Sequence, residues 1–262
     1  MFKVNKIYVG DNVKVMADIP DNFIDLTVTS PPYDNMRTYN GYTFDFEGVA
    51  NQLYRVTKPG GVVVWVVNDA TVNGSETGTS FRQALYFKEI GFNLHDTMIW
   101  NKGGFTAVGA IVSRYGQVFE YMFVLSKGKP KTFNPFKDKP NKKAGDKQRG
   151  TIRQKDGSMR LRSNIGRVRK SHGIRFNIWD MFGVNGKERT GHPAQYPESL
   201  ARDHILSWSN PGDIVLDPFS GSGTTAVIAK QQGREYIGID ISQEYCDIAN
   251  QRLKQTSIFS HI

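Results

Sequence analysis

A chain of 262 residues with 39% hydrophobic content is long enough to bury one substantial core, as one domain or as one domain with a small insert. It has no basic start followed by an unbroken apolar run and no stretch of 18 apolar residues, so we expect no secretory signal, no membrane span and a soluble, intracellular protein. The single cysteine, Cys246, excludes an internal disulfide and a multi-cysteine zinc site, and we predict no metal centre.

The net charge of +9 comes from one segment of the chain. From Lys127 to Arg175 there are 17 Lys and Arg residues and three Asp, which gives this segment a charge of +14. The rest of the chain has 17 basic and 22 acidic residues and is therefore negative. A disordered, solvated segment would have a similar composition, but such tails seldom lie between two well-patterned halves. We interpret the segment as a surface for a polyanion.

Short β-branched runs and amphipathic stretches alternate along the first half of the chain. They predict strands at residues 6–9, 26–29, 62–67, 97–100 and 121–125, and helices at 12–18, 46–57 and 80–90, with the Lys-Pro-Gly-Gly of residues 58–61 stopping the second helix. From residue 213 the pattern resumes, with strands at 214–216 and 236–239 and helices at 224–232 and 243–254. Seven strands alternating with helices predict an α/β fold with a mostly parallel sheet.

The middle of the chain lacks this periodicity and is rich in Lys, Arg, Gly and Asn. We therefore predict one domain made of residues 1–126 and 191–262, with residues 127–190 as an irregular surface insert.

A glycine turn lies near the carboxyl end, where Asp217-Pro218-Phe219-Ser220-Gly221-Ser222-Gly223-Thr224 follows a predicted strand and opens a predicted helix. Gly221, Gly223 and Ala226 have the spacing of a dinucleotide-binding turn, and Asp240 ends the next strand, where such turns place an acid for ribose hydroxyls. No Lys follows the glycines, so the turn is not a triphosphatase phosphate loop. It indicates a nucleoside-type cofactor, and the alternatives are a merely structural turn and an NAD-dependent oxidoreductase.

The position of this turn constrains the topology. Only about 40 residues follow it, too few for a conventional dinucleotide-binding domain, so the remaining strands must come from the front of the chain. The sheet is then circularly permuted.

A second motif, Thr29-Ser30-Pro31-Pro32-Tyr33, follows a predicted strand and therefore leaves the carboxyl edge of the sheet, where open α/β folds bind ligands. Two prolines stiffen the loop, which carries a hydroxyl, carbonyl acceptors and an aromatic ring. This set suits a planar base with an amino group: Ser30 and the Pro31 carbonyl accept hydrogen bonds from the amine, and Tyr33 stacks on the ring. An isolated Pro-Pro-Tyr is more often a stiff turn, but the strand before it and the glycine turn favour the functional interpretation.

Together these motifs resemble the amino-methyltransferases of DNA, which modify cytosine N4 or adenine N6. Further matches are His192-Pro193-Ala194-Gln195-Tyr196-Pro197, similar to the family's segment ahead of the cofactor strand, and Val56-Thr57-Lys58-Pro59-Gly60-Gly61. The order, with the catalytic motif first, the cofactor motif last and an insert between them, resembles the family's β group. The resemblance covers nearly all of the chain outside residues 127–190.

The resemblance implies a circularly permuted, Rossmann-like fold that uses S-adenosylmethionine, with the insert recognising the target. It implies catalytic roles for Ser30, Pro31, Pro32 and Tyr33, and cofactor contacts for Asp11, Thr29, His192, Pro193, Asp217, Phe219, Ser220, Gly221, Ser222, Gly223, Thr224 and Asp240. In the insert, phosphate and base contacts are expected from Arg160, Arg162, Arg167, Arg169, Lys170 and Arg175.

The expected activity is site-specific methylation of an exocyclic amine in double-stranded DNA, on a base flipped out of the stack. Within the family, Ser30 ahead of Pro-Pro-Tyr favours cytosine N4 as the modified amine, with adenine N6 as the alternative. A DNA-binding protein of this fold without catalytic activity is a further alternative. Cys246 lacks the context of a cytosine C5 nucleophile, so that chemistry is excluded. The family also allows a homodimer and a cognate restriction endonuclease as partners. We expect the protein to be cytoplasmic, in a bacterium or an archaeon or encoded by a phage.

Overall fold

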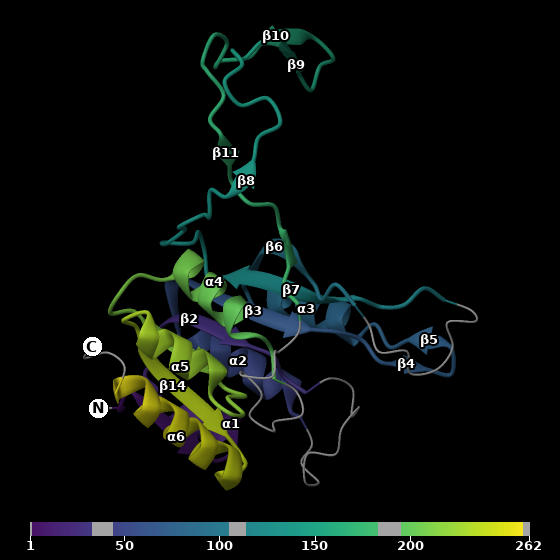
Figure 1. Ribbon diagram of the computed structural model, residues 1–262. Coiled ribbons are helices and arrows are strands. Elements are labelled where there is room, and N and C mark those ends of the chain that lie inside the picture. The colour runs from purple at the N-terminus through teal and green to yellow at the C-terminus, as the bar shows by residue number, and fades with distance from the viewer. Residues whose placement is uncertain (1, 33–43, 105–113, 183–194, 259–262) are drawn as a thin grey trace. The chain divides into compact units, whose positions relative to one another are not determined.

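The computed structural model describes residues 2–32, 44–104, 114–182 and 195–258 (Figure 1). The chain divides into two compact units: residues 1–134 with 177–262 form one, and Pro135–Phe176 form the other. The larger unit contains every element of the predicted sheet. No helix within the described ranges is long and apolar enough to cross a membrane.

The larger unit is built on an eight-stranded sheet. Its strand order is β1 (Lys6–Val9), β14 (Glu235–Asp240), β13 (Ile214–Asp217), β2 (Ile24–Thr29), β3 (Thr57–Val67), β7 (Phe119–Ser126), β6 (Asn93–Asn101) and β12 (Ile178–Asp180). The pairings of β7 with β3 and with β6 are antiparallel, and the other pairings in this sheet are parallel. The strands of the carboxyl-terminal segment, β13 and β14, thus lie between β1 and β2, which confirms the circularly permuted α/β fold.

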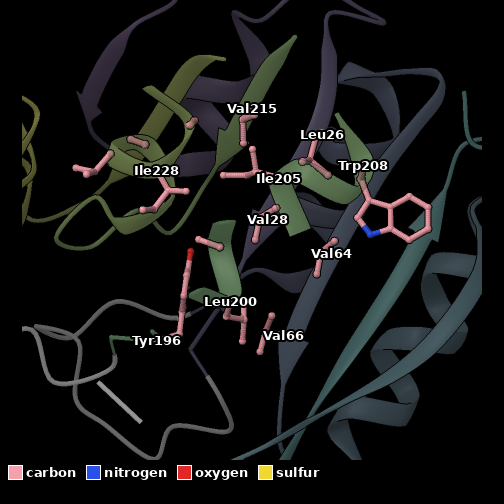
Figure 2. Close-up of a cluster of buried hydrophobic side chains, with 14 of the residues drawn as sticks. Leu26, Val28, Val64, Val66, Tyr196, Leu200, Ile205, Trp208, Val215 and Ile228 are labelled. Atoms are coloured by element: carbon pink, nitrogen blue, oxygen red, sulfur yellow. The ribbon is translucent and has the colours of Figure 1, made fainter. Parts of the chain in front are cut away.

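Three helices cover each face of the sheet, because alternate residues of the strands point to opposite sides. One face is covered by α1 (Asn12–Ala17), α2 (Phe46–Val56) and α3 (Thr79–Glu89), and the other by α4 (Glu198–Trp208), α5 (Thr224–Gln231) and α6 (Gln243–Ile258) (Figure 1). In β3, Val64 belongs to the α4–α6 layer and Trp65 to the α1–α3 layer. Figure 2 shows the first of these layers, with Val64 and Val215 of the sheet facing Ile205 of α4 and Ile228 of α5.

All seven predicted strands are present in the large sheet, and the structure adds an eighth strand to it. β12 comes from the segment predicted as an irregular insert, where three residues pair with the edge strand β6. Helix α4 was also not expected from the sequence. Residues 58–61 do stop α2, but they continue as the first part of β3 because Thr57 is already extended.

The smaller unit is an irregular β-ribbon without a core of its own. It contains the short pairings of β8 (Lys139–Pro140) with β11 (His172–Gly173) and of β9 (Thr151–Arg153) with β10 (Met159–Leu161). None of its residues is buried, and several large apolar side chains are exposed, among them Ile152, Met159 and Leu161. This unit therefore has little internal packing to fix its shape. An isolated two-stranded ribbon of this kind is only marginally stable in water.

The contrast between two leucines tests the α4 layer. Leu200 of α4 is fully buried in the layer that Figure 2 shows, whereas Leu85 of α3 is 56% exposed. We expect Leu200→Ala to lower the free energy of unfolding by about 2–5 kcal/mol, since it leaves a cavity. Leu85→Ala should change it by about 0.5 kcal/mol or less. Denaturant unfolding followed by circular dichroism measures both, and equal losses would contradict the assignment of α4 to the core.

Candidate functional site

Four loops with predicted site residues meet at one edge of the sheet. β1, β14, β13 and β2 are neighbours and run parallel, so their carboxyl ends share an edge. Asp11 follows β1, residues 30–32 follow β2, the glycine turn follows β13, and Asp240 ends β14. Open parallel sheets bind their ligands at this edge.

The glycine turn is closed by backbone hydrogen bonds. The amide of Ser220 donates to the Ile239 carbonyl at 2.9 Å, and that of Gly223 donates to the Ser220 carbonyl at 2.8 Å. Gly223 has φ +79°, and a Cβ there would lie 2.6 Å from the Cβ of Ala249 in α6. Glycine is therefore required at this position twice, for the left-handed backbone and for the close approach of α6.

Asp240 holds the glycine turn from the neighbouring strand. Its Oδ2 accepts a hydrogen bond from the Gly221 amide at 2.8 Å, and its Oδ1 accepts one from the Ser242 amide at 2.9 Å. Its carbonyl accepts from the amide of Gly10, next to Asp11, at 2.9 Å. Asp11 is exposed and caps α1, with its Oδ1 accepting from the Lys14 amide at 2.9 Å. Both acids thus have a structural role at the edge where they were predicted to contact a cofactor.

A buried carboxylate, Asp217, joins the two predicted motifs. The Thr29 hydroxyl donates to Asp217 Oδ1 at 2.6 Å, and the Phe219 amide donates to the same oxygen at 3.1 Å. The Tyr196 hydroxyl donates to Asp217 Oδ2 at 3.1 Å and also contacts the hydroxyl of Thr225. Thr29 is completely buried and donates to this carboxylate, and its contact with a cofactor stays a prediction.

Burial controls the ionisation of this group. Desolvation raises the pKa of Asp217 to about 6, although the hydrogen bonds from Thr29, Phe219, Thr225 and Tyr196 oppose the shift. Burial and the adjacent Asp217 carboxylate raise the pKa of Tyr196 well above its ordinary value, so its hydroxyl stays protonated and can donate. At neutral pH the pair therefore consists of a phenol and a carboxylate.

The other residues of the turn are mostly buried. Ser222 and Thr224 accept from the guanidinium of Arg252, at 2.7 Å on the Ser222 carbonyl and 3.3 Å on the Thr224 hydroxyl. Arg252 also donates to Glu198 Oε1 at 2.7 Å, which ties α6 to the start of α4. The hydroxyl of Ser220 is buried and has no hydrogen-bond partner among the described residues. Buried polar atoms are nearly always hydrogen-bonded, so this hydroxyl requires a partner that the described residues do not supply.

Phe219 is partly buried against the α1–α3 layer, on the face of the sheet opposite to Tyr196. Its ring meets Phe44 edge to face at a centroid distance of 5.3 Å, and it lies 6.3 Å from Trp65. Phe44 is the first described residue after the catalytic motif. Phe44 therefore packs directly against the glycine turn.

The structure describes only part of the predicted site. Ser30 and Pro32 are partly exposed and Pro31 is buried, while Tyr33, His192 and Pro193 lie outside the described residues. Sequence reasoning missed Arg252, for which no motif gave a signal, and gave no role to Thr225, which lies within the glycine-turn motif. It did quote Tyr196 within a motif, without a role for its hydroxyl.

The predicted DNA-contacting residues all lie in the smaller unit. Arg160, Arg162, Arg167 and Lys170 are exposed. Arg175 pairs with Asp138, with Nε 3.0 Å from Oδ2, and its guanidinium covers the ring of Phe136 at 4.3 Å. Its charge is thus partly neutralised within the unit, and Arg169 is only partly exposed.

Comparisons with known proteins agree with this arrangement. A family model described as DNA methylase, of the N6 and N4 type, matches residues 24–251. The chain is 58% identical to the orphan methyltransferase M.BamHII of Bacillus amyloliquefaciens, over 90% of this chain and 91% of the relative. It is 34% identical to the type II methyltransferase M.BglII of Bacillus subtilis, over 95% and 69%.

The fold is also similar to solved structures. The complex of M1.HpyAVI with S-adenosylmethionine superposes with a TM-score of 0.65 at 25% identity, covering 95% of this chain and 98% of that one. The chain belongs to the N6/N4 DNA methylase family and is a DNA methyltransferase.

The contact between Gly223 and Ala249 can be measured by substitution. Gly212 has a similar φ of +85°, and a Cβ there would meet nothing within 4 Å, so Gly212→Ala costs only the left-handed backbone, about 1–2 kcal/mol. We expect Gly223→Ala to cost more, because its Cβ also meets α6. Ala249→Gly should then be less destabilising in the Gly223→Ala background than in the wild type. Thermal unfolding of the four variants checks this, and strict additivity would contradict it.

Proposed function

We propose that this protein transfers a methyl group from S-adenosylmethionine to the N4 amine of a flipped cytosine in double-stranded DNA. The observation that carries the proposal is the hydrogen bond of 2.6 Å between Thr29 and Asp217, because it joins the strand ends from which the Ser30 loop and the glycine turn depart. The proposed sites for the methyl donor and for the methyl acceptor therefore lie on neighbouring loops at one edge of the sheet. Cytosine is favoured by Ser30 ahead of Pro-Pro-Tyr, and adenine N6 is the alternative.

The residues of the turn fit this cofactor. Gly221 and Gly223 have φ of +49° and +79°, which glycine adopts without strain in the tight turn of a nucleoside-type cofactor site, and the buried hydroxyl of Ser220 has no partner among the described residues. Asp240 retains free lone pairs beside its two amide bonds and can accept from ribose hydroxyls. When bound, S-adenosylmethionine supplies an electrophilic methyl group on a sulfonium.

The chain's own residues orient the amine. An aromatic amine is a poor nucleophile because its lone pair is delocalised into the ring. Hydrogen bonds from the amine to Ser30 and to the Pro31 carbonyl favour a pyramidal nitrogen without a strong base, and stacking on Tyr33 offsets part of the cost of flipping the base. Positioning of the two partners supplies much of the acceleration, and the methylated amine then releases its proton to solvent.

The smaller unit is proposed to recognise the DNA. It carries 14 Lys and Arg residues against three Asp, and it exposes apolar side chains beside them. A two-stranded β-ribbon fits the major groove, where cations contact phosphates and guanine edges and apolar side chains contact thymine methyl groups. The cytoplasmic location, a homodimer and a cognate restriction endonuclease stay predictions.

The base that is modified is found by nucleoside analysis. After incubation of unmethylated genomic DNA with the protein and S-adenosylmethionine, digestion and mass spectrometry should show N4-methyl-deoxycytidine. Ser30→Ala should lower the rate on the order of 100-fold, because the amine loses one of two acceptors. Ser75→Ala, at an exposed position of the larger unit outside the proposed site, is the control for the substitution itself. The appearance of N6-methyl-deoxyadenosine would assign the alternative base.

Salt dependence tests the ribbon. Arg160 is exposed and has no ion pair within the described residues, so Arg160→Gln should reduce the slope of log affinity against log salt by about one. Arg175→Gln should reduce it less, because Asp138 already pairs with this guanidinium. Binding of S-adenosylmethionine should be unchanged in both variants. Equal slopes in the wild type and Arg160→Gln, measured by fluorescence anisotropy, would remove Arg160 from the DNA interface.

A further inference from the structure

A chain of buried hydroxyls lies beneath the two loops of the site. Tyr196 is 8% exposed and packs in the α4–α6 layer, where Figure 2 shows its hydroxyl pointing away from Leu200. This hydroxyl contacts Asp217 in β13 and Thr225 in α5. The Thr225 hydroxyl is also 3.1 Å from the Val28 carbonyl in β2. Tyr196 thus connects the strand before the glycine turn with the strand before Ser30.

Side chains hold these strand ends together where backbone pairing has ended. The register between β2 and β13 runs from Val215↔Leu26 to Leu216↔Thr27. Beyond that point the hydrogen bond of Thr29 to Asp217 links β2 to β13, and that of Thr225 to the Val28 carbonyl links α5 to β2. Tyr196 contacts both Asp217 and Thr225. The separation of the two loops therefore depends on these few buried polar contacts.

We propose that Tyr196 is a positioning residue for methyl transfer, which sets the catalytic loop after β2 against the cofactor turn after β13 through Asp217 and Thr225. The inference rests on the proposed function of the two loops. Tyr196 itself lies beneath them and is buried. Its effect is on the geometry of the reacting groups, to which transfer rates are sensitive.

The charges near this chain are few. Asp217 and the guanidinium of Arg252 act on Tyr196, and Arg252 is itself paired with Glu198. The hydrogen bond from Tyr196 lowers the pKa of Asp217 against the larger effect of burial, which leaves it at about 6. Loss of the Tyr196 hydroxyl must therefore raise the pKa of Asp217 further. If the carboxylate form holds the loops, the acid side of the rate profile moves to higher pH.

The test measures single-turnover transfer from tritiated S-adenosylmethionine to unmethylated genomic DNA. Tyr196→Phe keeps the ring and removes the hydroxyl. We expect the transfer rate at pH 7.5 to fall by about 10-fold or more, with less than about a 3-fold change in the dissociation constants for S-adenosylmethionine and DNA. The acid limb of the rate should shift upward in pH relative to the wild type.

The chain offers matched controls. Tyr236 is a buried tyrosine of the same layer whose hydroxyl makes no hydrogen bond with a described residue, and Tyr236→Phe should leave the rate unchanged. Thr225→Val should impair transfer as Tyr196→Phe does, whereas Thr225→Ser should retain it. The double variant Tyr196→Phe with Thr225→Val should be no slower than either single one, because both break one chain.

Three outcomes would overturn the inference. Tyr196→Phe could behave like Tyr236→Phe at every pH between 5.5 and 8, or it could weaken cofactor binding in proportion to the rate, which would make Tyr196 a part of the cofactor pocket only. Thr225→Ser could also be as slow as Thr225→Val. If Tyr196→Phe does not fold, the Thr225 pair decides alone. Failure of the wild type to methylate any DNA would instead refute the proposed function.

Discussion

The buried carboxylate of Asp217 is the contact on which the arrangement of the site depends. It lies at the end of β13, is 1% exposed and collects hydrogen bonds from Thr29, Phe219 and Tyr196. Burying a charge costs free energy unless the charge is hydrogen-bonded. Moving any of these partners away from the carboxylate would therefore be unfavourable. Because those partners belong to β2, the glycine turn and the segment before α4, one group relates three parts of the chain.

The two units of the chain solve different physical problems. The larger unit buries two apolar layers against one sheet, and this packing fixes the strand ends on which the loops depend. The smaller unit buries no residue and exposes both cations and apolar side chains. Such a surface gains little from its own packing and can gain more from a polyanionic partner. Under the proposed function, methyl transfer uses the well-packed larger unit and DNA recognition uses the smaller unit.

The permuted topology explains why motifs from opposite ends of the sequence lie at one edge of the sheet. β13 and β14 enter the sheet between β1 and β2, so the turn after β13 is next to the loop after β2. Parallel pairing then brings both loops to the same edge, since parallel strands share their direction. Membership of the N6/N4 DNA methylase family agrees with this order of motifs.

The sequence alone determined the seven strands, the glycine turn and the family, because these depend on local periodicity and on motifs that are contiguous in the chain. It did not predict α4, whose buried face includes the polar residues Asp203 and His204 and so lacks a clear apolar stripe. It did not predict β12 either, since three residues become a strand only where the edge of β6 is free to pair. The contacts of Thr29 and Tyr196 were decided by tertiary structure. Thr29 and Asp217 are 188 positions apart, and no local pattern records that folding brings a hydroxyl and a carboxylate together in the buried interior.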